Sequence, residues 1–256
     1  MPNKKSPLKA RPLRNPGESL EQEIDRLIND RAMAYMVAAG VMVAITLLEW
    51  LRWWRGFEVP LAIWTVLTVL FVIAVGVIVW KTRIRVHNLR QGLDGEKAVG
   101  QYLERLRDRG AHILHDLPGD GFNVDHVVIH PSGVYAIETK TYSKPAKGGP
   151  QIVFDGDQVR VAGYTPERNP VRQAQACAAW VREQVMELTG KKVPVRPVVV
   201  FPGWFVQPTA ESKGSDVWVL NPKALPAFID HSDRVMSDPD VHLIASSLSR
   251  HVRNSV

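Results

Sequence analysis

Two long stretches without a single charged residue constrain this chain more than any other feature. The first, Ala32–Leu48, covers 17 residues, and the second, Val59–Trp80, covers 22. A helix needs about 20 mostly apolar residues to cross the hydrocarbon core of a bilayer. The second stretch is long enough, and the first is long enough if Trp50, Trp53 and Trp54 form an interfacial aromatic belt. The alternative is a pair of buried core helices, but such helices carry a polar face, which these stretches lack.

The basic residues around these stretches predict how the hairpin is oriented. The loop between them carries two basic residues, Arg52 and Arg55, and both flanks carry more. Lysine and arginine accumulate on the cytoplasmic side of membrane helices, so both termini are expected in the cytoplasm, with the hairpin in an inner or plasma membrane. The flanking residues are seven in 1–31 (Lys4, Lys5, Lys9, Arg11, Arg14, Arg26 and Arg31) and four in 81–91 (Lys81, Arg83, Arg85 and Arg90).

The domain layout follows from these boundaries. The first apolar stretch begins only at residue 32 and no small-residue cleavage site follows it, which argues against a cleaved signal peptide. The start of the leader is expected to be disordered because it is rich in proline and charge, and a helix is expected from Glu18 onward. The expected segments are a cytoplasmic leader (1–31), a first membrane helix (32–50), an external loop (51–58), a second membrane helix (59–80), a basic linker (81–91) and a cytoplasmic domain (92–256).

Charge and cysteine content narrow the class of the protein. The net charge of +6 favours an anionic partner, either nucleic acid or a phospholipid surface. The single cysteine, Cys177, excludes an internal disulfide and a cysteine-based zinc site. A reducing compartment is therefore expected for the folded domain.

The cytoplasmic domain alternates helical and strand patterns, which predicts an α/β fold. Its helices are expected to flank a mixed sheet. The expected helices are 92–110, 169–190 and one near 241–251, and the expected strands are 112–118, 124–129, 134–140, a short hairpin at 151–163, 193–203 and 216–220.

Charged residues stand on two of these strands, where apolar residues are expected. Side chains alternate across a strand, so Glu138 and Lys140 share one face and lie side by side at the strand end. Asp125 approaches them if the two strands pair as a hairpin. Glu96, near the start of the expected helix 92–110, offers a third carboxylate. The pattern therefore predicts three carboxylates and one lysine at a single site.

This combination suits metal-assisted phosphodiester chemistry. Carboxylate oxygens are the ligands that Mg²⁺ prefers, and Mn²⁺ is the related alternative. A lysine beside them can orient or deprotonate a water, or offset the charge of a phosphate. The alternative for an isolated Glu-x-Lys is a solvated surface pair. The twelve residues between Asp125 and Glu138, which span a hairpin, make the pattern more restrictive.

Three segments, "GLDGEKAVGQYL", "NVDHVVIHPSGVYAIETK" and "NPVRQAQ", resemble the nuclease-related (NERD) domain of the PD-(D/E)xK nuclease superfamily. The resemblance covers roughly residues 88–225 and implies a restriction-endonuclease-like α/β core. It implies that Glu96, Asp125 and Glu138 hold the metal and that Lys140 is the catalytic lysine. Gln173 matches a glutamine that accompanies the core in related nucleases. Members often have an acidic residue two positions before the core aspartate, where this chain has Asn123.

These observations predict a membrane-anchored nuclease that uses Mg²⁺ or Mn²⁺ and acts on nucleic acid, with DNA as the expected substrate. Lys144, Lys147 and Arg172 are the expected phosphate contacts. His126 is expected to be structural, since it points to the strand face opposite Asp125. The first alternative is an inactive nuclease fold that binds nucleic acid or a protein at the membrane, and the second is a purely structural membrane assembly factor.

Overall fold

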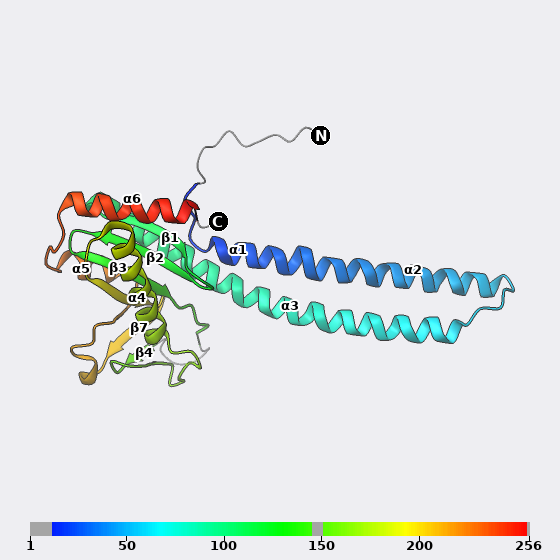
Figure 1. Ribbon diagram of the computed structural model, residues 1–256. Coiled ribbons are helices and arrows are strands. Elements are labelled where there is room, and N and C mark those ends of the chain that lie inside the picture. The colour runs from blue at the N-terminus through cyan, green and yellow to red at the C-terminus, as the bar shows by residue number, and fades with distance from the viewer. Residues whose placement is uncertain (1–11, 145–150, 255–256) are drawn as a thin grey trace, which may run out of the picture. The chain divides into compact units, whose positions relative to one another are not determined.

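The computed structural model describes residues 12–144 and 151–254, and its elements are shown in chain order in Figure 1. The chain forms two compact units. One consists of Leu20–Arg90, and the other combines Met1–Ser19 with Gln91–Val256. The disorder that we expect at the start of the leader falls on residues 1–11, which lie outside the described residues.

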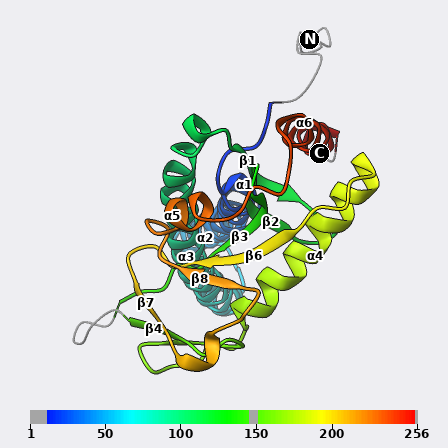
Figure 2. The same ribbon diagram turned by 90° about the vertical axis from the view of Figure 1, so that its left-hand side faces the viewer.

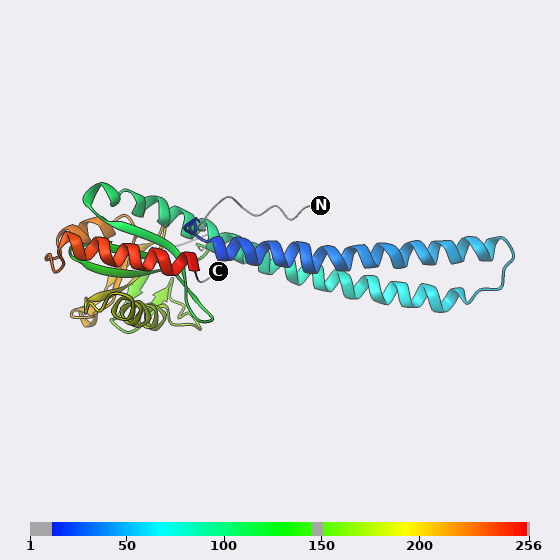
Figure 3. The same cartoon turned by 45° about the horizontal axis from the view of Figure 1, so that its top comes forward.

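The unit Leu20–Arg90 is helical throughout most of its length. It contains most of α1 (Glu18–Asp25), a π-helical segment η1 (Arg26–Met33), α2 (Ala34–Trp54) and most of α3 (Leu61–Glu104). Within it, α2 and α3 run side by side (Figure 3). A hydrogen bond of 2.6 Å between the buried hydroxyls of Thr46 and Thr68 joins them.

Both long helices could cross a membrane by their length and composition. The first membrane helix extends further than expected, because α2 continues to Trp54 and includes part of the expected loop 51–58. It ends where the chain meets Gly56, whose φ of 87° is not helical, and Pro60 precedes α3. The tryptophans therefore lie on the last turns of a helix.

The expected helix 92–110 is the end of α3, which runs without a break from Leu61 through the basic segment 81–91 to Glu104. Our expectation that Glu96 lies near a helix start is therefore wrong. Residues 81–91 contain no proline or glycine, so nothing there forces the helix to end. A short 3₁₀ turn (Arg107–Arg109) follows, and Gly110 closes it with a φ of 82°.

The main sheet has the strand order β1-β2-β3-β6-β8. Its first three strands are antiparallel, and β3, β6 and β8 are parallel, so the sheet is mixed as expected. Their bounds are β1 (His112–Pro118), β2 (Asn123–His130), β3 (Gly133–Thr139), β6 (Val195–Val200) and β8 (Trp218–Leu220).

A second, smaller sheet has the order β5-β4-β7. Its strands β4 (Gln151–Phe154) and β5 (Val159–Val161) form the expected short hairpin. The third strand, β7 (Phe205–Pro208), was not expected because it is short, mostly exposed and ends in a proline. Its parallel pairing with β4 is a tertiary contact that no local sequence pattern predicts.

Helices cover both faces of the main sheet (Figure 2). On one face, α4 (Pro170–Thr189) and α6 (Asp238–Asn254) pack over apolar residues of β1, β2 and β3. On the other face, the end of α3 and the short α5 (Leu225–Asp230) do the same. The fold is therefore the expected α/β arrangement, a mixed sheet between helices.

Candidate active site

The hairpin of β2 and β3 places two of the predicted acidic residues at one end of the sheet. The strands pair in antiparallel register, with His126 opposite Ile137. Beyond that pair, Asp125 Oδ2 accepts a hydrogen bond of 2.7 Å from the backbone N–H of Thr139. The side chain of Asp125 is thus fixed against the end of β3, where Glu138 and Lys140 lie.

Glu138 lies at the centre of this cluster and is 2% exposed. Its Oε1 accepts hydrogen bonds from Lys140 Nζ at 2.7 Å and from Gln173 Nε2 at 2.6 Å. Its Oε2 is 3.9 Å from the Cys177 thiol, which donates to it. Gln173 and Cys177 lie four residues apart on α4 and therefore face the same way. The helix thereby restrains Glu138 from one side.

Glu96 reaches the same region from α3, and a glycine makes this approach possible. A Cβ atom on Gly95 would lie 1.8 Å from Thr141 Oγ1. The backbone of the helix therefore packs directly against the chain beyond β3, where glycine has no side chain. Any larger residue at 95 would push helix and strand apart. Glu96 itself is buried.

The electrostatics show that these groups influence one another. Burial, followed by the charges of Asp116 and Glu138, raises the pKa of Glu96 to about 8. Burial, with Glu138 and Glu96, also raises the pKa of Asp125 well above its usual range. Burial alone would lower the pKa of Lys140, but the neighbouring Glu138 raises it above its ordinary value. The site thus concentrates more negative charge than one lysine neutralises.

The chemistry of these donors fits a hard divalent cation. The carboxylates of Glu96 and Glu138 are buried and that of Asp125 is partly buried, and a cation bound between them would relieve their mutual repulsion. Beside Lys140, the buried Thr139 Oγ1 and Thr141 Oγ1 make no hydrogen bond in the described part of the chain. Among the residues described, no group of three His, Cys, Asp or Glu is already arranged as a metal-binding cluster.

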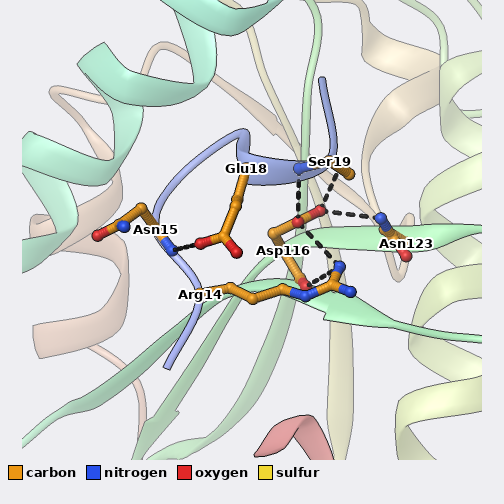
Figure 4. A network of polar contacts seen from close by, with 6 residues as sticks. All are labelled: Arg14, Asn15, Glu18, Ser19, Asp116 and Asn123. Atoms are coloured by element: carbon orange, nitrogen blue, oxygen red, sulfur yellow. Dashed lines mark hydrogen bonds and ion pairs between the residues drawn. The ribbon is translucent and has the colours of Figure 1, made fainter. Parts of the chain in front are cut away.

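Sequence reasoning missed a fourth acidic residue, Asp116 on β1, which is 1% exposed. Four donors surround its carboxylate (Figure 4), and three of them come from Arg14 and Ser19 in the leader. The fourth is the amide of Asn123 at 3.0 Å. The available signal was a charge on an apolar strand, the same signal that identified Asp125.

Two of the predicted phosphate contacts, Lys144 and Arg172, lie on the surface near this cluster. Lys144 is exposed, with its ammonium beside Gly203. Lys147 lies outside the described residues. Arg172 is exposed on α4, next to Gln173, and borders a pocket of about 660 Å³ together with Arg168.

His126 is fully buried on the face opposite Asp125. Its Nδ1 lies 2.9 Å from Nδ1 of His115, which in turn contacts Glu104 on α3 at 3.0 Å. Burial, and then the neighbouring His115, lowers the pKa of His126 well below its usual value. These contacts join the sheet to α3, in line with a structural histidine.

Comparison with known proteins finds three similarities in this chain. A 57-residue stretch is 37% identical to an uncharacterised protein of Bacillus anthracis, and it covers 20% of this chain and 27% of that protein. The solved structure of SfsA from Pyrococcus furiosus in complex with Ca²⁺ matches with 16% identity and a TM-score of 0.29, over 50% of this chain and 55% of that one. The chain thus spans about a quarter of the first relative and little more than half of the second, and a TM-score this low supports no inference.

The family model for the nuclease-related domain matches residues 91–202. This range includes the end of α3 with Glu96, the β2–β3 hairpin with Asp125, Glu138 and Lys140, and the helix with Gln173. Residues 91–202 of this chain therefore match the nuclease-related (NERD) domain.

Proposed function

We propose that this protein is a membrane-anchored, divalent-metal-dependent nuclease that hydrolyses phosphodiester bonds in DNA. One observation carries the proposal: residues from α3, β2, β3 and α4 bring three carboxylates, a lysine and a glutamine to one end of the main sheet. Within a nuclease-related domain, this set of groups suits phosphodiester hydrolysis better than any other reaction.

Asp125, Glu138 and Glu96 would hold Mg²⁺ or Mn²⁺. When bound, such an ion polarises the phosphodiester and lowers the pKa of a water. Lys140 supplies positive charge, because its raised pKa keeps it protonated at neutral pH. As a cation it can offset the charge of the phosphate. Gln173 and Lys140 together hold one oxygen of Glu138 in place.

The surface around the site supports an extended anionic substrate. Lys144 and Arg172 flank the cluster on separate segments and are exposed. A pocket of about 740 Å³ lies at the carboxyl ends of β6 and β8, the same sheet edge that carries Lys140. It is lined by Lys223 and by Phe205, which is 66% exposed. Lysines beside exposed aromatic rings are typical of surfaces that bind single-stranded nucleic acid.

The helices of Leu20–Arg90 would anchor the protein in an inner or plasma membrane. Most of their large apolar side chains are exposed, such as Leu47 at 64% and Leu70 at 59%, which suits a lipid environment. The residues before and after this unit both belong to the same compact unit. Both ends of the hairpin must therefore lie on one side of the membrane, and the basic flanks favour the cytoplasmic side.

The proposal is tested by plasmid cleavage with the full-length protein in detergent. We expect Mg²⁺- or Mn²⁺-dependent cleavage and a loss of about 100-fold or more in Lys140→Ala, the size typical of removing one charge-stabilising group. Lys192→Ala removes an exposed lysine away from the site and is the matched control. Equal cleavage by the wild type and Lys140→Ala would refute the assignment.

A second candidate function is binding without hydrolysis. It is favoured by the absence, among the described residues, of a ready-made cluster of three metal ligands. The same samples separate the two candidates. DNA binding with a steep salt dependence and no metal-dependent turnover would identify a binding module.

A further inference from the structure

We propose that residues 12–19, which precede the membrane hairpin in the sequence, are an integral part of the nuclease domain, and that Asp116 is the positioning residue that holds them against Glu96. The role given to Glu96 rests on the proposed function. The docking of residues 12–19 does not depend on it.

The carboxylate of Asp116 makes most of its hydrogen bonds with the leader (Figure 4). Oδ2 accepts from Arg14 Nη1 at 3.0 Å and from the Ser19 backbone N–H at 2.9 Å, and Oδ1 accepts from Ser19 Oγ at 2.7 Å. Asp116 is buried. If residues 12–19 moved away, its carboxylate would keep only Asn123 of these four hydrogen-bond donors. A buried carboxylate that loses its partners is strongly destabilising.

The backbone conformation of Asp116 supports its proposed role as the residue that holds the leader. Its φ is 50°, a left-handed conformation that few residues other than glycine adopt. Strained conformations of this kind persist where surrounding contacts hold them. The four hydrogen bonds to the carboxylate are such contacts.

The leader also packs on the turns of α3 that carry Glu96. A Cβ atom on Gly17 would lie 2.4 Å from Leu93 Cδ1 and 3.4 Å from Glu96 Oε2. One helical turn further along, a Cβ on Gly100 would lie 2.6 Å from Pro16 Cγ. Leu93, Glu96 and Gly100 are spaced three and four residues apart, so they share one face of the helix. The leader covers that face.

The leader turn is held by contacts of its own as well. The Asn15 backbone N–H donates to Glu18 Oε2 at 3.0 Å, and the Glu18 N–H donates to Asn15 O at 3.2 Å. Gly17 adopts a φ of 71°, which a glycine tolerates without strain. This turn presents Arg14 and Ser19 to Asp116 together.

A consequence concerns how the domain is built. The hairpin of Leu20–Arg90 is inserted between two segments of one compact unit. A soluble fragment that starts near residue 88 would keep the family core but lose Arg14 and Ser19. The full-length protein is therefore the right material for a test.

Docking is tested by hydrogen exchange of the peptide that contains Ser19, in full-length protein in detergent. We expect Ser19 to exchange at least about tenfold more slowly than an unstructured amide, and to lose this protection in Asp116→Asn. Arg26→Ala, which changes an exposed arginine of the following segment, should keep it. An unprotected Ser19 in the wild type, or one that stays protected in Asp116→Asn, would overturn the proposal.

The positioning role is tested by calorimetric titration with Mn²⁺. We expect Arg14→Ala to weaken Mn²⁺ binding by about tenfold, as is typical when a residue that orients a ligand is removed. Val185→Ala, a buried change on α4, lowers the Tm without touching the leader and should leave Mn²⁺ affinity unchanged. Wild-type affinity in Arg14→Ala would overturn the positioning role while the proposed function stands. A wild type that binds no metal would overturn both, and hydrogen exchange would still decide docking.

Discussion

At the scale of single residues, Asn123 shows why this chain departs from the pattern of the nuclease-related domains that it resembles. Its amide donates to Asp116 Oδ1 at 3.0 Å, so the position serves a buried carboxylate. An acidic residue there would place two carboxylates in contact. The amide at 123 and the leader donors therefore form one arrangement around Asp116.

Replacing this amide by a carboxylate should destabilise the domain at neutral pH. Asn123→Asp removes a donor and adds a like charge, which together cost about 1–3 kcal/mol in the free energy of unfolding. Protonation of the introduced carboxylate relieves the repulsion, so the loss should shrink as the pH falls toward 4. Denaturant unfolding at pH 8 and pH 5 measures this, with Asn123→Ala as the neutral control. A loss that is equal at both pH values would contradict it.

The raised pKa values at the site predict how the Tm increase on adding Mn²⁺ would depend on pH. Glu96, with a pKa of about 8 against an ordinary 4.5, holds a proton in the folded state that the unfolded state releases. Its contribution to the free energy of unfolding therefore falls as the pH rises from about 4.5 to 8. Because Mn²⁺ replaces this proton, the Tm increase on adding Mn²⁺ should be larger at pH 8.5 than at pH 6.

Thermal unfolding with and without Mn²⁺ checks this expectation. Glu96→Gln should flatten the pH dependence, since it has no proton to exchange. His126 acts in the opposite direction, because its lowered pKa makes the folded state lose stability as the pH falls below about 6.5. The contribution of His126 cancels when the Tm values with and without Mn²⁺ are subtracted at the same pH.

At the scale of elements, α3 is the part that most separates expectation from structure. It carries apolar residues expected in the membrane, basic residues of the linker and Glu96 in one unbroken helix. Two of its glycines offer a matched comparison. Gly95 contacts Thr141, whereas a Cβ on Gly76 would meet nothing within 4 Å.

Gly95→Ala should therefore impair the site although alanine favours helix more than glycine by about 1 kcal/mol. The added Cβ would overlap Thr141 Oγ1 and move Glu96 away from the end of β3. We expect cleavage to fall by about tenfold or more, because small displacements of reacting groups are costly. Gly76→Ala should leave cleavage unchanged. Equal activity of the two variants would show that the close contact at Gly95 is not needed.

At the scale of the whole molecule, the hairpin is an insertion within a domain. The compact unit that holds the site takes residues from both sides of Leu20–Arg90. With the hairpin in a membrane, as we propose, this arrangement requires that both of its ends lie on the same side.

Cysteine labelling of intact cells tests this topology. A membrane-impermeant maleimide should label Phe57→Cys, in the loop between the two helices, and should not label Asp30→Cys or Lys192→Cys. The native Cys177 is buried and contributes little background. Labelling of Asp30→Cys but not of Lys192→Cys from outside would place the leader and the domain on opposite sides and exclude docking on Asp116.

The amino-acid sequence by itself determined the features that depend on local order. Two uncharged stretches predict membrane-length helices, alternation predicts β2 and β3, and a hairpin brings Asp125 to Glu138 and Lys140 because the turn between them is short. The sheet class follows from the same alternation of elements. None of these inferences needs contacts between distant segments.

The tertiary structure alone decided which distant residues complete the site. Gln173 reaches Glu138 across 35 positions, and Arg14 and Ser19 reach Asp116 across 102 and 97. Such contacts depend on how helices and strands pack, and no local pattern encodes that packing. The same reason applies to the unbroken α3, since only its packing beside Thr141 shows why a glycine precedes Glu96.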